Sequence, residues 1–309
     1  MQALVSSRVP KPAAKRSAFQ RSAAGLLRGW HLLSLDAPTV AVTWCAAFLS
    51  VIGVPLTRPA ARWPIVFLSL ATWLCYVGDR VQDARSALDG PALRPRHHFY
   101  GNWWRSHRPS LVALVCLAAL ACATTGFLGL PTPLLVYYLV LSLASLSYFA
   151  WVHSGRERSA RALAKEAAVA VIFALGCILP AWSSASSALR FQLLPAGLLF
   201  ALLCWLNCVA IERWEGRGIV GAYAHPSTHW AARHLNALLI ACASAAAMLA
   251  IWRYNVGRPT ALAPYLACAF VLLAALERWR LRFSVDSLRI FADLALLTPL
   301  AWFAAKISG

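Results

Sequence analysis

The sequence predicts an all-α protein that crosses a membrane many times, and two observations support this prediction. Of the 309 residues, 60% are hydrophobic and only 13% are charged, whereas about 25% charged residues is usual for a soluble domain. The apolar residues form long runs along the whole chain, each close to the ~20 residues that a helix needs to cross a bilayer. The net charge of +18 is confined to the ends of these runs. Membrane topology explains that placement, so nucleic acid is not expected as a partner.

Nine of these runs qualify as transmembrane helices. They cover residues 37–56, 63–79, 110–129, 132–152, 165–183, 191–211, 232–252, 261–277 and 288–306. The range 165–183 contains Gly176 and Pro180, which membrane helices tolerate. We therefore expect a polytopic integral membrane protein of about nine helices around a central cavity open to the cytoplasmic side. Residues 1–33 are expected to form a basic cytoplasmic arm, and residues 34–309 the transmembrane domain.

The basic residues predict the orientation of these helices. On the nine-span topology, 23 Lys and Arg fall on the side of the N-terminal arm and 6 on the other side. An excess of this kind marks the cytoplasmic side. The N-terminus is thus expected in the cytoplasm and the C-terminus outside, in a bacterial inner or plasma membrane. All eleven acids and all eight histidines fall on or near the cytoplasmic side, so any chemistry is expected to face the cytoplasm.

Two clusters of carboxylates follow spans that end in the cytoplasm. Asp79 and Asp83, with Asp89 further on, follow the second span; Glu212 and Glu215 follow the sixth. The stretches "GDRVQD" and "IERWEG" share an acid, an arginine, an apolar residue and a second acid. This similarity predicts an internal duplication with two four-helix halves, about 37–152 and 165–277, and a final helix 288–306.

Paired carboxylates of this kind suit a hard divalent cation. Asp79 and Asp83 lie one turn apart on a helix, where two carboxylates repel each other unless a cation or a basic partner lies between them. Mg²⁺ binds one or two carboxylates and is completed by waters and substrate phosphate. Basic residues nearby would hold the outer phosphate oxygens; the candidates are Arg94, Arg96 and Lys165. The alternative is a set of interfacial ion pairs, such as Asp79 with Arg80 and Glu212 with Arg213.

The layout resembles the UbiA superfamily of intramembrane prenyltransferases, whose second helix is typically followed by N-D-x-x-D-x-x-x-D and an Arg-Pro stretch. The segment "GDRVQDARSALDGPALRPR" is similar. Asp79 stands in the place of the leading Asn, and Asp83 matches the central Asp. Asp89 comes two residues late, and Arg94 and Pro95 stand where the Arg-Pro pair follows.

The second acidic motif of that family is usually of the D-x-x-x-D kind. Here Glu212 matches the first acid, Glu215 comes one residue early, and Gly216 holds the expected position. The segment "KEAAVAVIFALGCILPAW", which begins at Lys165, also resembles the fifth helix of the family with its preceding basic residue. The resemblance covers nearly the whole chain by layout, although its motifs are degenerate.

The resemblance implies a membrane transferase that moves an isoprenyl group from a prenyl diphosphate to a lipophilic acceptor with Mg²⁺. It assigns the binding of Mg²⁺-diphosphate to Asp79, Asp83, Glu212 and Glu215. Arg94, Arg96 and Lys165 would neutralise the leaving diphosphate, and Asn207 would help to orient metal or acceptor or, alternatively, pack helices together. Two other functions stay open: a non-catalytic protein of the same fold that binds lipid or partner proteins, and a transporter. A transporter predicts ionisable residues deep in the spans, and only Asp293 lies some two turns inside one.

Two further segments carry polar residues. The stretch "RPRHHFYGNWWRSHR", Arg94 to Arg108, is dense in Arg, His and aromatic residues. It would bind anionic lipid headgroups, cap the site as a lid, or simply follow the topology as a basic loop. His225 and His229 have the i, i+4 spacing of helical metal ligands, but the chain has no H-E-x-x-H motif there.

Overall fold

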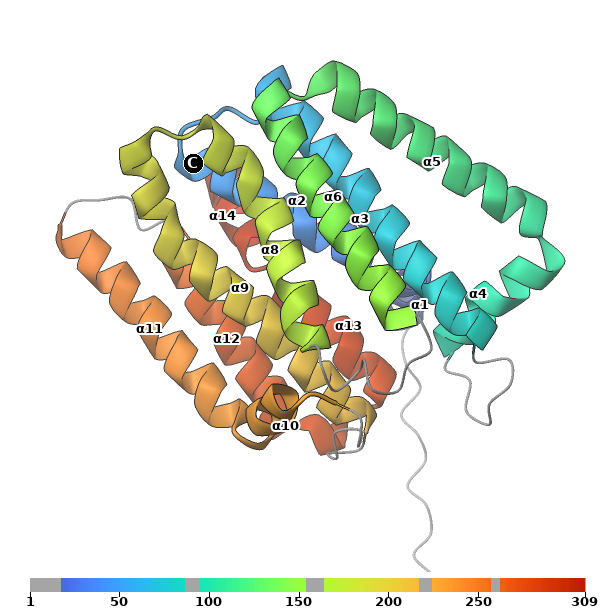
Figure 1. Cartoon of the computed structure of the whole chain (residues 1–309). Coiled ribbons are helices and arrows are strands. Elements are labelled where there is room, and N and C mark those ends of the chain that lie inside the picture. Colours follow the sequence, from blue (N-terminus) through green and yellow to red (C-terminus); the bar gives the residue numbers. More distant parts are fainter. Residues whose placement is uncertain (1–17, 87–94, 154–163, 217–223, 257–261, 309) are drawn as a thin grey trace, which may run out of the picture.

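The computed structural model describes residues 18–86, 95–153, 164–216, 224–256 and 262–308, and every regular element in these ranges is a helix (Figure 1). The helices are α1 (Ala18–Leu32), α2 (Asp36–Val51), α3 (Pro59–Ser86), α4 (Pro95–Ser106), α5 (Arg108–Gly129), α6 (Thr132–His153), α8 (Lys165–Ser184), α9 (Ser187–Glu215), α10 (Pro226–Arg233), α11 (Leu235–Asn255), α12 (Ala263–Arg278), the 3-10 turn η2 (Arg280–Arg282), α13 (Val285–Ala295) and α14 (Pro299–Ser308).

Six of these helices are long and apolar enough to span a membrane: α3, α5, α6, α8, α9 and α11. Two bent pairs, α1 with α2 and α13 with α14, raise the number to eight if each pair is one span. The nine predicted ranges all fall on a helix or a bent pair, but α12, on the range 261–277, has only 16 residues. The prediction of an all-α protein with several membrane-spanning helices is confirmed, and the finer count of nine stays a prediction.

The long helices lie side by side, so that one end of the bundle gathers several segments that are distant in sequence (Figure 1). The ends of α3, α9 and α12 and the start of α8 lie at that end, together with the short helices α4 and α10. It is the end where the sequence places the cytoplasm. The motif acids Asp79, Asp83, Glu212 and Glu215 are therefore all on helices that reach the same end of the bundle.

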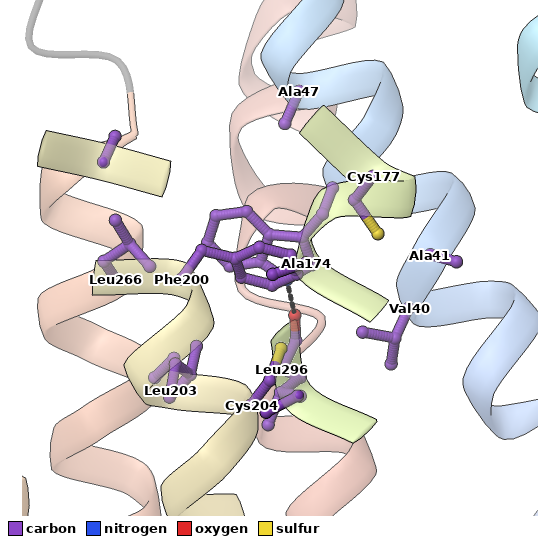
Figure 2. Packing of buried hydrophobic residues seen from close by; sticks show 14 of the residues in the cluster. Val40, Ala41, Ala47, Ala174, Cys177, Phe200, Leu203, Cys204, Leu266 and Leu296 are labelled. Atoms are coloured by element: carbon purple, nitrogen blue, oxygen red, sulfur yellow. Dashed lines mark hydrogen bonds between the residues drawn. The ribbon is translucent and has the colours of Figure 1, made fainter. Parts of the chain in front are cut away.

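The core is centred on α2, α8 and α9, where aromatic rings fill the space between the helices (Figure 2). Trp44 of α2 stacks on Phe200 of α9 with ring centroids 4.4 Å apart, and Phe48 meets Phe200 edge-on at 5.8 Å. None of these three side chains is exposed. Small residues such as Ala174 and Cys177 on α8 let the backbones approach closely around the rings.

Both bent pairs break where other groups satisfy the backbone. Between α1 and α2 the chain turns by 87° at Ser34, whose φ of 58° is left-handed, and the Leu35 N–H bonds back to the Trp30 carbonyl at 3.0 Å. Between α13 and α14 the bend is 48°. There the Trp44 Nε1–H donates to the Leu296 carbonyl at 2.8 Å, the hydrogen bond drawn in Figure 2. An apolar interior demands such partners for every freed carbonyl.

A smaller core joins α3, α4 and α5. It consists of Val77, Ala84, Tyr100 and Leu111, with partly buried aromatic residues around them. The Tyr100 hydroxyl lies 2.8 Å from Ser34 Oγ at the bend after α1. Burial raises the pKa of the Tyr100 hydroxyl above its ordinary value, so this group stays protonated and the hydrogen bond fastens α4 to the bend.

Candidate functional site

The first motif lies in the last turns of α3, which continues unbroken to Ser86. Asp79 and Asp83 are therefore helical and one turn apart, as the spacing predicts, and both are partly buried and engage other groups. Arg96 is in α4. Asp89 and Arg94 lie outside the described residues, so their predicted roles stay predictions.

Asp79 belongs to a polar region that α3 shares with α6 and α8. Asp79 and Glu166 are both close enough to Tyr148 to interact with it electrostatically, and so is Cys208 of α9. The Tyr148 hydroxyl is buried and has no hydrogen-bond partner among the described residues. A buried hydroxyl without a partner is costly, so this position suits a ligand that carries a hydrogen-bonding group.

The start of α8 supplies an acid and a base to this region. Lys165 is exposed, and Glu166 accepts a 2.6 Å hydrogen bond from the hydroxyl of the fully buried Thr228, which ties α8 to α10. Cys208 lies within electrostatic range of Lys165 and Glu166. The sequence predicts Lys165 as a site residue but not Glu166. The only sequence signal for Glu166 is its place directly after that lysine.

The helix α9 contributes a second buried polar atom. Asn207 is 7% exposed, and its Oδ1 has no hydrogen-bond partner among the described residues. It follows Phe200 and Leu203 along the buried face of α9 and precedes Cys208. This placement is compatible with both predictions for Asn207, an orienting ligand and a packing residue, because its Oδ1 accepts no hydrogen bond from the described residues.

The second motif contacts two other helices, α12 and α13. Glu215, at the end of α9, forms an ion pair with Arg289 of α13. Glu212 is partly buried one turn earlier. Glu277 of α12 accepts a 2.7 Å hydrogen bond from Trp214 Nε1 and forms ion pairs with Arg213 and Arg280. The interfacial ion pair that the sequence offers as an alternative for Arg213 thus involves Glu277.

A buried charge network that the sequence analysis missed closes the bend between α1 and α2. His31 Nδ1 lies 2.7 Å from Asp36 Oδ2, and Arg80 of α3 donates to the same oxygen at 3.2 Å and to the His31 carbonyl at 2.7 Å. Asp293 of α13 lies 4.0 Å from His31 Nδ1. All are buried or nearly so. The sequence signal for this network was the presence of His31 and Asp36 just before the apolar run 37–56.

Among the described residues, one group brings three potential metal ligands together: His31, Asp36 and Asp293, with ligand atoms within 4.8 Å of one another. The guanidinium of Arg80 already occupies the Asp36 oxygen that faces His31. A cation there would have to displace a buried positive charge, so the group fits a charge network better than a metal centre. The described carboxylates Asp79, Asp83, Glu212 and Glu215 belong to no such group of three, although Mg²⁺ itself needs only one or two.

Comparisons with protein families, with curated proteins and with solved structures found no match for this chain. The interpretation of the site therefore rests on its own residues.

Proposed function

We propose that this chain is a UbiA-like membrane transferase that moves an isoprenyl group from a prenyl diphosphate to a lipophilic acceptor with the help of Mg²⁺. One observation supports it above the others. At one end of an apolar bundle, Asp79, Glu166 and Asp293 are partly buried on three different helices, and the buried Tyr148 hydroxyl has no hydrogen-bond partner among the described residues. Ionisable residues inside a membrane bundle are costly and usually serve function.

The proposed magnesium ion would take hard oxygen donors from two helices. Asp79 and Asp83 on α3 offer carboxylate oxygens one turn apart, and Asn207 offers a buried amide oxygen whose hydrogen-bonding capacity is unused. These are the hard oxygen ligands that Mg²⁺ prefers. Glu212 and Glu215 would complete the set from α9. When bound, Mg²⁺ supplies positive charge to the leaving diphosphate.

The residues of the chain would then act on the two ends of the substrate. Lys165 of α8 and Arg96 of α4, together with Arg94, would hold the diphosphate oxygens while the carbon–oxygen bond to the isoprenyl group breaks. The isoprenyl chain would lie among the apolar side chains of the bundle, which excludes water from the allylic cation. The acceptor bonds to that carbon and releases a proton.

The ion pair of Glu215 with Arg289 favours a second candidate, a non-catalytic protein of this fold that binds lipid or a partner protein. A carboxylate that an arginine neutralises is a weaker cation ligand. The two candidates differ in whether diphosphate binding requires both Mg²⁺ and the α3 carboxylates.

The deciding measurement is the affinity of the purified protein for farnesyl diphosphate, with Mg²⁺ and with EDTA. We expect binding only with Mg²⁺, and a loss of about tenfold or more in Asp79→Asn and in Asp83→Asn, because each removes a charged ligand. Asp286→Asn is the matched control, since Asp286 is an exposed acid at the same end of the bundle. Binding that ignores Mg²⁺ and both α3 variants would reject the transferase and leave the lipid-binding candidate.

A further inference from the structure

A basic pocket lies apart from the polar region described above, between α1, α4 and the start of α5. Its volume is about 830 Å³. Arg28 reaches it from α1, Arg105 from α4, and His107 from the residue that caps α5. These three side chains are exposed. None of the described residues that line the pocket is acidic, so its positive charge is not neutralised from within.

Apart from Asn102, the rest of the lining is apolar or aromatic. Leu32 and Leu33 come from the end of α1, and Phe99 and Trp103 from α4. Phe99 and Trp103 pack edge-on with ring centroids 5.9 Å apart and rest on the small core around Tyr100. The pocket thus joins two arginines to a preformed apolar wall, and this pairing matches a molecule with an anionic head and an apolar body.

The position of the pocket suits a membrane lipid. α1 and α4 lie at the bundle end where the sequence places the cytoplasm (Figure 1). Directly after His107, α5 begins and carries exposed apolar side chains along its length, among them Leu117, Leu120 and Leu128. A headgroup in the pocket would therefore leave its acyl chains free to lie against a surface that already faces hydrocarbon.

We propose that this pocket binds the phosphate headgroup of an anionic phospholipid from the cytoplasmic leaflet. Arg28 and Arg105 donate to the phosphate oxygens, and Leu32, Phe99 and Trp103 contact the glycerol and the first methylenes. Diffuse attraction of a basic loop to a negative surface needs no particular arginine. Two arginines from separate helices at one pocket predict instead that these two matter more than others at the same end of the bundle.

The test compares lipid binding by two double variants. Arg28→Gln/Arg105→Gln removes the pocket cations, and Arg233→Gln/Arg282→Gln removes two exposed arginines of α10 and η2, outside the pocket. Native mass spectrometry of the full chain would measure bound phosphatidylglycerol against phosphatidylcholine. We expect the pocket variant to bind phosphatidylglycerol about tenfold more weakly than the control variant, because charge-assisted hydrogen bonds are lost. Phosphatidylcholine binding should be equal in both.

Three results would overturn the proposal. Equal losses in both double variants would mean diffuse surface attraction. Binding of phosphatidylcholine as tightly as phosphatidylglycerol by the unmodified protein would mean that the headgroup charge is not recognised. Displacement of the lipid by millimolar inorganic phosphate would mean a site for free anions. Arg28→Lys/Arg105→Lys keeps the charge and checks the fold: it should retain selectivity for phosphatidylglycerol, and its loss would count against the pocket.

Discussion

The helices α9 and α6 have similar composition but opposite surroundings. Over an apolar stretch of 18 residues, the mean hydropathy is 2.1 in α9 and 1.7 in α6. Yet 56% of that stretch is buried inside the bundle in α9 and only 11% in α6. Lipid tails are as apolar as a protein core, so hydrophobicity does not decide which helix is central. α9 carries what does: Phe200 stacks on Trp44, Trp214 donates a hydrogen bond to Glu277 of α12, and both side chains are buried. Central position in this molecule follows from shape and polar partners.

The largest expected effect tests the polar partners. Arg80→Met should lower the free energy of unfolding by about 3–5 kcal/mol, because it leaves the buried Asp36 without its guanidinium. Adding Asp36→Leu to that variant should restore much of the loss. Unfolding of the purified protein in mixed micelles measures both. Arg62→Met, an exposed arginine of α3, serves as control and should change stability by less than about 0.5 kcal/mol.

The next effect compares packing in the two helices directly. Phe200→Ala should lower the free energy of unfolding by about 3 kcal/mol. This is at the low end for such a change, because the variant loses packing contacts, whereas moving an apolar side chain between protein core and lipid changes the free energy little. Leu143→Ala on α6, where the side chain is 67% exposed, should be nearly neutral. Equal losses in the same unfolding assay would mean that α6 is packed against a partner, and the contrast with α9 would fail.

The smallest effect concerns the break between α13 and α14. Trp44→Phe keeps the ring against Phe200 but removes the donor to the Leu296 carbonyl, so we expect a loss of about 1–2 kcal/mol. Trp182→Phe is the control, because Trp182 is partly buried near the far end of α8. No difference between the two variants would mean that another group satisfies the carbonyl.

Hydropathy and spacing predicted the helices well. The apolar runs mark each long helix to within a few residues at most ends, because a bilayer imposes the length. They could not predict the 87° turn at Ser34 or the bend after Ala295. Both depend on hydrogen bonds from α4 and α2, which are far away in the sequence.

The site was predictable only where it is local. Asp79 and Asp83 share a helical face because they are four residues apart, and this needs no tertiary information. Glu215 pairs with Arg289 of α13, and Trp214 beside it bonds to Glu277 of α12, so the spacing of residues within one motif says nothing about these partners. In the sequence, Arg80 is one of the basic residues that mark the cytoplasmic side. In the structure, it is a buried donor to His31 and Asp36, which the sequence does not indicate.

The bend at Ser34 also limits how the chain can be shortened. By composition, residues 1–33 are a basic arm that invites removal for expression. Yet Arg80 bonds to the carbonyl of His31, and the indole of Trp30 donates to Thr39 at 3.0 Å. Removal of residues 1–33 would delete the His31 carbonyl, one of the two groups that accept hydrogen bonds from the buried Arg80; the other is Asp36. Removal of only the residues before Ala18 would keep both acceptors.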